Sequence, residues 1–233
     1  MPHKSFSSIT LRLISSAILI PIVMCLIAIG EWFFIGLVAL CIAIALIEWS
    51  KIAVHMSFSS GFQYAFRYIL ICIGFLYLSF SFLEMSYLRE QEDGLFWTIL
   101  FMISVWASDS TAYLFGKTIG GAKMSPTISP NKTWSGYAGA LIGPALVLLA
   151  AVHVIPFFPE ALATPSLLVT GLAGILVGIA GQSGDLMISA MKRKAGLKDT
   201  GALIPGHGGI LDRIDALLLA LPVYLAYVEY VTE

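Results

Sequence analysis

The chain has 233 residues, of which 58% are apolar and 12% charged, and its formal net charge is −1. About a quarter of the residues are charged in a soluble domain, so this composition excludes an ordinary soluble protein. Apolar runs recur from end to end, each close to the ~20 residues that a helix needs to cross a bilayer. The sequence therefore predicts a polytopic membrane protein, and we expect no nucleic-acid partner.

Seven apolar runs are predicted to span the membrane as helices, because backbone polar groups in lipid must be satisfied within the segment. In chain order they are Leu11–Ile29, Trp32–Trp49, Phe66–Leu83, Leu95–Phe115, Tyr137–Ile155, Ser166–Leu186 and Ile214–Val231. The first run comes after Lys4, has Arg12 at its start and resembles a signal peptide, but it is long enough to span, so we interpret it as a retained helix. The predicted fold class is an all-α transmembrane helical bundle.

The Lys and Arg residues predict the orientation of these spans. Of the 13 Lys and Arg residues, all but Arg89 lie in the loops, or at the adjoining span ends, on one side of the predicted bundle. The opposite loops and the C-terminus are acidic instead, with Glu31, Glu84, Glu90, Glu92, Asp93, Glu160, Glu229 and Glu233. The positive-inside rule then predicts a cytoplasmic N-terminus and an outside C-terminus. We expect a multi-pass protein of the inner (cytoplasmic) membrane, with its polar loops on the cytoplasmic side.

Polar residues that could bind a ligand or take part in catalysis are concentrated in the second part of the chain. Residues 1–94 hold three predicted spans and read as an N-terminal scaffold. Residues 95–233 hold four spans and both polar cytoplasmic loops, and read as the catalytic region. Cys25, Cys41 and Cys72 lie inside apolar runs, which indicates buried hydrophobic residues rather than a disulfide framework or a zinc site.

The first polar loop begins at Asp109, near the cytoplasmic end of the fourth predicted span. A carboxylate there needs a partner, which could be Lys117, Lys132, a helix terminus or a metal ion. Two interpretations of Asp109 stay open: it pairs with one of these groups for structural reasons, or it lines a polar cavity. Glycine pairs, lysines and hydroxyls follow, and these could form a phosphate cradle of backbone amides and ammonium groups. The candidate nucleotide- or phosphate-binding residues of this loop are Asp109, Lys117, Ser129, Lys132 and Thr133.

The second polar loop follows Asp185, which closes the sixth predicted span. Asp212 and Asp215 are three residues apart where the last helix begins, so they share one face of it. One acid at a helix start could simply complement the helix dipole. Three convergent carboxylates suit Mg²⁺ better, because this hard cation takes carboxylate and phosphate oxygens. We therefore predict a magnesium site held by Asp185, Asp212 and Asp215, and a second cation stays open.

The same loop carries cations and glycines. Lys192 and Arg193 could extend to lipid headgroups or bind a substrate phosphate. His207 could contact phosphate or take part in catalysis, or it could only pack the loop, and glycines beside it let the backbone approach a ligand closely. The candidate catalytic residues are Asp185, Lys192, Arg193, Lys198, Asp199, His207, Asp212, Arg213 and Asp215, and Gly208 and Gly209 join the phosphate-binding candidates.

The order of these residues resembles a known signature. Ser189-Ala-Met-Lys192-Arg193, Lys198-Asp199, Pro205-Gly-His207-Gly208-Gly209 and Asp212-Arg213-Ile-Asp215 resemble the signature of phosphatidate cytidylyltransferases, also called CDP-diacylglycerol synthases. The first loop, from Asp109 through Gly116-Lys117 to Ser129–Trp134, is similar to the second motif of that family. It departs at Asn131 and Ser135, where family members commonly have Lys and Glu. The resemblance is strong over residues 95–233 and only general over residues 1–94.

The resemblance implies an enzyme whose partners are CTP, phosphatidic acid and the membrane lipid, with Mg²⁺ as cofactor. Its products are CDP-diacylglycerol and pyrophosphate. Such a reaction needs positioning and charge neutralisation more than a strong base, because the lipid phosphate is already an anionic nucleophile. Lys132, Lys198 and Arg213 become candidates for the triphosphate, and Lys192 and Arg193 for the lipid phosphate.

Two alternatives stay open. One is a related CTP-dependent transferase that acts on another lipid, since the apolar grooves that select a lipid cannot be read from sequence. The other is an ion or solute transporter with Asp109 and Asp185 as intramembrane ligands. That alternative predicts inverted repeats, which the sequence does not display, and whether the chain forms a homodimer is open.

Overall fold

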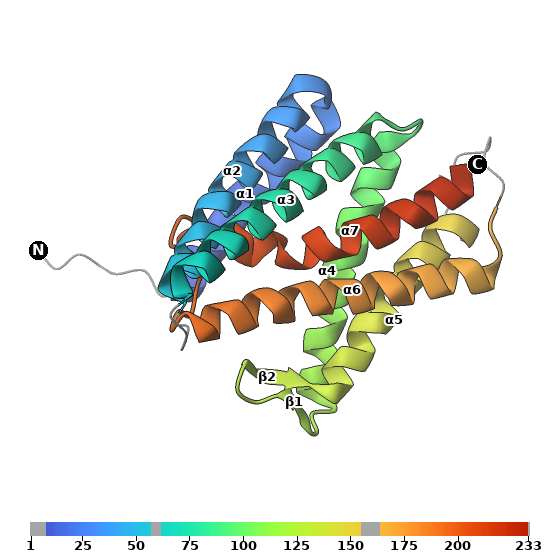
Figure 1. The fold of residues 1–233 in the computed structure, drawn as a ribbon. Helices are drawn as coiled ribbons and strands as arrows, with labels where there is room; N and C mark the ends of the chain where they lie inside the picture. The colour runs from blue at the N-terminus through green and yellow to red at the C-terminus, as the bar shows by residue number, and fades with distance from the viewer. Residues whose placement is uncertain (1–7, 57–61, 155–163, 233) are drawn as a thin grey trace, which may run out of the picture. The chain divides into compact units, whose positions relative to one another are not determined.

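The computed structural model describes residues 8–56, 62–154 and 164–232 (Figure 1). Over these residues the chain forms seven helices and one two-stranded hairpin. They are α1 (Ser8–Ile29), α2 (Glu31–His55), α3 (Gln63–Glu90), α4 (Gly94–Thr118), β1 (Lys123–Ser125), β2 (Ser129–Thr133), α5 (Trp134–His153), α6 (Leu167–Lys194) and α7 (Leu211–Thr232). Each predicted span falls on one helix, and Ile155, the last residue of the fifth, lies outside the described residues.

The predicted class, an all-α polytopic membrane protein, is confirmed. Among the described residues, six helices, α2 to α7, are long and apolar enough to cross a membrane. For α1 the apolar stretch Ile14–Ile29 is shorter. Two helices extend past the predicted ends, since α3 continues to Glu90 and α6 to Lys194, with 28 residues each, whereas α5 ends at His153, before the predicted end. Glu84 and Glu90, which were expected in a loop, therefore lie on α3.

The first polar loop contains structure that the sequence analysis did not predict. Strands β1 and β2 form an antiparallel hairpin between α4 and α5, with Lys123 opposite Thr133 and Ser125 opposite Ser129 (Figure 1). Thr133 ends the hairpin and begins the next helix, because its hydroxyl oxygen accepts the backbone N–H of Gly136 at 3.1 Å. A threonine is a favoured N-cap for this reason. The hairpin is thus joined to α5 without a linker.

The chain packs as two compact units, each built from separated segments. The first unit comprises Met1–Phe82 and Met191–Ile214, and the second comprises Leu83–Ala190 and Asp215–Glu233. The first unit therefore holds α1, α2, most of α3 and the loop before α7. The second holds α4, the hairpin, α5 and most of α6 and α7. The predicted division at residue 94 concerns function, and it stays a prediction.

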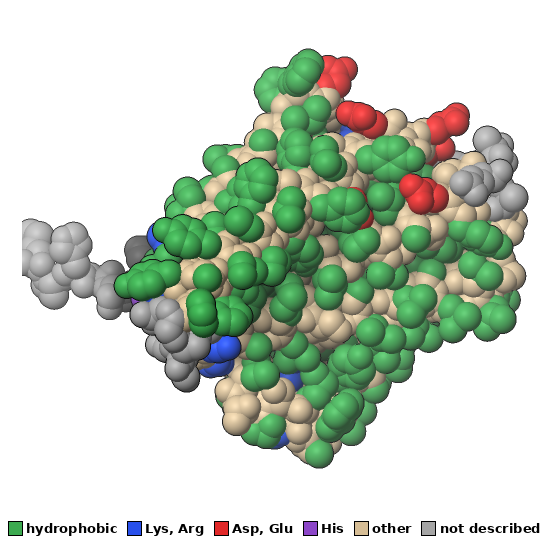
Figure 2. Space-filling view, viewed as in Figure 1, with side chains coloured by type: hydrophobic (Ala, Val, Ile, Leu, Met, Phe, Trp, Pro, Cys, Tyr) green, Lys and Arg blue, Asp and Glu red, His purple; other side chains and the backbone are tan. Residues whose placement is uncertain are grey.

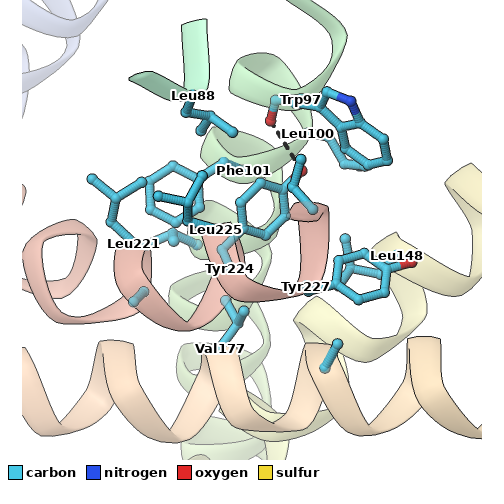
Figure 3. Packing of buried hydrophobic residues seen from close by; sticks show 14 of the residues in the cluster. Leu88, Trp97, Leu100, Phe101, Leu148, Val177, Leu221, Tyr224, Leu225 and Tyr227 are labelled. Carbon is cyan, nitrogen blue, oxygen red and sulfur yellow. Dashed lines mark hydrogen bonds between the residues drawn. The ribbon is translucent and has the colours of Figure 1, made fainter. Parts of the chain in front are cut away.

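The second unit has a continuous apolar core (Figure 3). Trp97 and Phe101 of α4 pack with Tyr224 of α7, and Val177 and Leu148 join from α6 and α5. The hydroxyl of Tyr224 donates to the backbone carbonyl of Trp97 at 3.0 Å. This bond satisfies a phenol that is fully buried, and an unsatisfied buried hydroxyl would be costly.

Glycines let the helices of the second unit approach closely. A β-carbon on Gly143 would collide with the backbone of α4, and one on Gly178 with the backbone of α5. A β-carbon on Gly184 of α6 would collide with the backbone carbonyl of Asp215 on α7. Such small-residue contacts are how helices associate in lipid, where burial of apolar surface gives little driving force. The packing therefore fits a membrane protein and brings Asp185 and Asp215 onto adjoining helices.

Large apolar side chains are exposed on both units. Trp32 is 80% exposed, Tyr68 69% and Leu168 71%, and Figure 2 shows apolar side chains over much of the visible surface. Contiguous apolar surface of this extent marks contact with lipid or protein. Together with the long apolar helices, it identifies a multi-pass membrane protein.

Candidate functional site

The second unit contains a cavity of about 420 Å³ that is lined by the first polar loop and by the part of α6 that holds Asp185. It lies among α4, the hairpin, α5 and α6. Its lining residues are Asp109, Ala112, Tyr113, Gly116, Lys117, Met124, Asn131, Lys132, Thr133, Gly136, Tyr137, Gln182 and Asp185. Four of the five candidates from the first loop are in this set, and so is Asp185. Ser129 is not among them and instead opens strand β2.

A chain of polar contacts crosses this cavity. The ammonium of Lys132 lies 2.7 Å from Oδ2 of Asp185 and donates to Oε1 of Gln182 at 3.0 Å. The amide nitrogen of Gln182 lies 3.4 Å from Oδ1 of Asp109, to which it donates. The other oxygen of Asp185, Oδ1, accepts the hydroxyl of Ser189 at 3.1 Å. Lysine, amide and two carboxylates thus form one connected network from three elements.

Partial burial makes this network stronger than a surface ion pair. The side chain of Lys132 is 19% exposed and that of Asp185 31% exposed. Exposed pairs contribute only ~0–1 kcal/mol, whereas charges attract each other more strongly where protein displaces water. The arrangement holds one ammonium fixed at the cavity wall, where an incoming anion can reach it.

Lys117 and Tyr113 form a second cationic element of the lining. The Lys117 ammonium lies 5.4 Å from the centroid of the Tyr113 ring and donates to its hydroxyl at 3.3 Å. Contact with an aromatic face stabilises a cation without neutralising it. Gly116 allows α4 to pack closely against Thr133, since a β-carbon at Gly116 would lie 3.2 Å from the Thr133 hydroxyl. Thr133 itself caps α5, so its hydroxyl already has a structural role.

Gln182 is a lining residue that the site prediction omitted. It lies three positions before Asp185 on α6, and residues at that spacing share a helix face. It accepts from Lys132 of β2 and donates to Asp109 of α4, so it connects both elements to α6. The available signal was this spacing together with the polarity of Gln182 in an apolar helix.

In the first unit, Asp212 is held by four donors. The ammonium of Lys192 lies 2.5 Å from Oδ1. The other oxygen, Oδ2, accepts the N–H of Thr200 at 2.8 Å, the hydroxyl of Thr200 at 3.0 Å and the N–H of Gly209 at 3.1 Å. The side chains of Lys192 and Asp212 are 10% and 5% exposed. The Lys192 ammonium therefore contacts Asp212, whereas the sequence analysis left open whether Lys192 reaches lipid headgroups or a substrate phosphate.

Glu48 of α2 is a second buried acid of the first unit, and the site prediction missed it. It is 3% exposed. Its Oε2 accepts the Thr200 hydroxyl and the N–H of Leu211, both at 2.8 Å, and its Oε1 accepts the N–H of Ile210 at 3.2 Å. An ionisable residue inside an apolar helix was the available signal, because such residues are rare and usually functional.

His207 is anchored through both ring nitrogens. The hydroxyl of Ser15 lies 2.9 Å from Nδ1, and that of Ser16 lies 3.3 Å from Nε2. The loop around it turns at Gly206 and Gly208, which have φ angles of 78° and 85°, a left-handed conformation that favours glycine. These contacts correspond to the packing alternative for His207, and a catalytic role stays a prediction.

The remaining candidates fall into two environments. Arg193, Lys198, Asp199 and Arg213 are exposed in the first unit, and Arg193 donates to the backbone carbonyl of Leu197 at 3.1 Å. Asp215 is 8% exposed in the second unit, where its carboxylate accepts the N–H of Ala216 at 2.9 Å. The exposed cations are accessible to a charged ligand.

The three predicted magnesium ligands do not form a recognisable metal-binding cluster among the described residues. Within residues 8–56, 62–154 and 164–232, no group of three or more His, Cys, Asp or Glu is placed to hold a metal ion. Asp185 and Asp215 belong to the second unit and Asp212 to the first. Their carboxylate oxygens fit the ligand chemistry of Mg²⁺, although Asp185 and Asp212 each bind a lysine. The ligand set stays a prediction.

The fold and site define a class: a multi-pass all-α membrane protein whose polar segments carry buried and partly buried Lys–Asp pairs. A known family, described as the cytidylyltransferase family, matches residues 53–231. The chain belongs to this family of CTP-using transferases, which confirms the resemblance seen in the sequence. The match includes both polar loops and all the candidate site residues.

Individual relatives bear the name phosphatidate cytidylyltransferase. The protein of Rickettsia felis is 32% identical over 221 residues, which cover 94% of this chain and 92% of that protein. The protein of Staphylococcus aureus strain COL is 35% identical over 182 residues, covering 77% and 66%. The protein of Brucella abortus is 44% identical over 149 residues, covering 63% and 52%. The chain thus spans about half the length of the Brucella relatives it matches and most of the Rickettsia relative.

Proposed function

We propose that the chain is an integral-membrane phosphatidate cytidylyltransferase, which converts CTP and phosphatidic acid to CDP-diacylglycerol and pyrophosphate. The names of its relatives support this reaction. The structural observation that carries the proposal is the cavity that holds Lys132 beside Asp185. An enzyme that joins two polyanions needs fixed cations, and this cavity offers a cation that is already oriented.

The reaction is an in-line displacement at phosphorus. An oxygen of the lipid phosphate attacks the α-phosphorus of CTP, the new P–O bond forms, and the bond to the β-phosphate oxygen breaks. Pyrophosphate leaves with the electron pair. A phosphate monoester carries a charge of about −1.5 to −2 near neutral pH, so the nucleophile needs no strong base. The barrier is the approach of two anions, and positioning and neutralisation lower it.

The residues of the cavity are suited to that task. Lys132 and Lys117 are proposed to neutralise phosphate oxygens of CTP. Asp185 and Gln182 keep the Lys132 ammonium in place before CTP arrives. A preorganised donor of this kind stabilises developing charge without reorganising during the reaction. In this proposal, Lys132 exchanges part of its contact with Asp185 for contact with a phosphate.

The cations of the second loop complete the proposal. Lys198 and Arg213 are exposed and are proposed to contact the triphosphate. Lys192 and Arg193 lie in the last turn of α6 and are proposed to contact the lipid phosphate, for which Lys192 would exchange part of its contact with Asp212. Mg²⁺, when bound, would neutralise phosphate oxygens and the departing pyrophosphate, and Asp185, Asp212 and Asp215 are its candidate ligands. We also propose that both loops face the cytoplasm of a bacterial inner membrane, where CTP is available.

The test is lipid-dependent release of pyrophosphate by the purified protein. The protein in mixed micelles receives CTP, Mg²⁺ and phosphatidic acid, and the controls omit the lipid or replace CTP with ATP. The proposal expects pyrophosphate only when CTP and phosphatidic acid are both present. Release with another lipid alone would favour a related transferase, and no release with any lipid would overturn the proposed activity.

A further inference from the structure

We propose that Glu48 is a positioning residue for the loop 199–212, acting through Thr200 on Asp212. This inference rests on the proposed function, in which Asp212 serves the reaction. Glu48 lies on α2, in the part of the sequence that was expected to be only a scaffold. Glu48 is 3% exposed, so its carboxylate needs hydrogen-bond donors from the protein in place of water.

Backbone N–H groups at the start of α7 provide hydrogen bonds to the buried Glu48 carboxylate. The N–H groups of Ile210 and Leu211 donate to the two oxygens of Glu48 at 3.2 and 2.8 Å. The first N–H groups of a helix have no partner within the helix, and the helix dipole favours negative charge at this end. Glu48 therefore caps α7 from another helix and fixes where it begins, one residue before Asp212.

Thr200 transmits this position to Asp212. Its hydroxyl lies 2.8 Å from Oε2 of Glu48 and 3.0 Å from Oδ2 of Asp212, and its backbone N–H donates to that same Oδ2 at 2.8 Å. A hydroxyl donates only one hydrogen, so the two carboxylates compete for it. Loss of the Glu48 carboxylate would therefore free Thr200 to shift, and such a shift changes two of the four contacts that orient Asp212.

Two glycines allow the loop to close around the Glu48 carboxylate. A β-carbon at Gly201 or Gly209 would collide with its oxygens. The N–H of Gly209 donates to Oδ2 of Asp212 at 3.1 Å, so the residue that packs on Glu48 also holds Asp212. The same loop therefore contacts both acids at Thr200 and at Gly209, and its shape depends on both.

The decisive comparison is Glu48→Gln with Glu84→Gln as the matched control. Both replace a buried glutamate of an apolar helix, since Glu84 on α3 is 7% exposed. The side-chain amide introduced by Glu48→Gln would turn an N–H₂ group toward backbone N–H donors, which breaks the cap. Misplacement of a group near the chemistry lowers rates by up to about 100-fold. We expect Glu48→Gln to lower kcat about 10- to 100-fold, with the KM values for CTP and lipid within about twofold.

A role confined to stability gives a different result. In that case Glu48→Gln would lower the melting temperature while the folded protein kept the wild-type kcat, and this outcome overturns the proposal. An equal loss of kcat in Glu48→Gln and Glu84→Gln would overturn it as well. Glu84→Gln is expected to keep kcat within about twofold of wild type, because its loss leaves the loop 199–212 in place.

A second pair of variants covers the case in which Glu48→Gln does not fold. Thr200→Val removes the shared hydroxyl at nearly constant shape, and Thr200→Ser keeps it. One hydrogen bond contributes about 0.5–1.5 kcal/mol, so we expect Thr200→Val to lose up to about tenfold in kcat while Thr200→Ser stays near wild type. Equal kcat values for the two variants would overturn the proposal.

Amide hydrogen exchange separates this inference from the proposed function. In the full chain in micelles, Glu48→Gln should speed the exchange of the amides of Thr200, Gly209, Ile210 and Leu211, and Glu84→Gln should not. Unchanged exchange in Glu48→Gln overturns the positioning role, whatever the activity. If the wild type releases no pyrophosphate with any lipid, the proposed function fails while the exchange result still decides the role of Glu48 in the loop.

Discussion

Lys132 of the hairpin places its ammonium 2.7 Å from Asp185 of α6, and the same ammonium donates to Gln182 one turn earlier on that helix. The hairpin is thereby tied to α6 at the wall of the cavity. A lysine with two fixed partners loses less freedom on meeting an anion than a mobile surface lysine would. This pair is therefore the contact whose removal should most affect binding of a phosphate.

Lys132→Met should lower kcat/KM for CTP by about 10- to 100-fold. The reason is the loss of one charged hydrogen-bond donor, worth about 1.5–3 kcal/mol. Lys123→Met is the control, because Lys123 is exposed at the start of β1 and does not line the cavity. The measurement is initial rate against CTP concentration at saturating phosphatidic acid. If the two methionine variants have equal kcat/KM, Lys132 has no role in binding CTP.

Asp212→Asn should lower activity more than about 100-fold and also destabilise the protein. Removing one partner of a buried ion pair costs about 3–5 kcal/mol, and here it leaves the Lys192 ammonium, in a side chain that is 10% exposed, opposite a neutral amide. The control is Asp93→Asn, since Asp93 is exposed in the turn before α4 at a φ of 56°, which asparagine also tolerates. Rates and thermal melting of both variants provide the measurement, and a wild-type rate for Asp212→Asn would remove Asp212 from the reaction.

The helices could be predicted from sequence because lipid leaves the backbone few alternatives. Every predicted span is on a helix, yet the predicted ends of α3 and α6 are too early. Hydropathy falls where charged residues such as Glu84 and Lys192 appear, but the helical hydrogen bonds continue past them to Glu90 and Lys194. Polarity therefore locates the edge of the apolar segment rather than the end of the helix.

The hairpin and Glu48 could not be predicted with the same reasoning. Lys123–Thr133 has no clear alternation of apolar and polar residues, and Pro130 argues against a strand except at an edge. The hairpin has two strands only, so both of its strands are edges. Glu48 carries a polarity signal, but its partners Thr200 and Leu211 lie more than 150 residues away in the chain. Only the folded chain reveals such a contact.

The orientation in the membrane can be tested with single cysteines. In a background without Cys25, Cys41 and Cys72, a cysteine at Lys123 should react with an impermeant maleimide only after the cells are permeabilised, whereas one at Glu92 should react in intact cells. The basis is the positive-inside rule applied to the loops that hold these residues. Reaction at Lys123 in intact cells would place the cavity on the outer side and contradict the proposed use of cytoplasmic CTP.

Gly184 offers a test of how α6 and α7 are held together beside the two acids. A β-carbon there would collide with the backbone carbonyl of Asp215 and lie 3.2 Å from the β-carbon of Leu219. Neither the carbonyl nor the helix backbone can move aside without separating the helices. Overpacking of this kind costs about 1–3 kcal/mol, so Gly184→Ala should lower the thermal stability of the purified protein.

Gly36→Ala is the matched control for that substitution. Gly36 also lies within an apolar helix, but a β-carbon there would meet no other atom within 4 Å. Alanine is favoured over glycine in a helix interior by about 0.5–1 kcal/mol, so Gly36→Ala should leave stability unchanged or raise it. Because Asp185 follows Gly184 directly and Asp215 provides the opposing carbonyl, Gly184→Ala should also lower the rate of pyrophosphate release. Equal melting temperatures for the two alanine variants would show that α6 and α7 are not in the close contact described here.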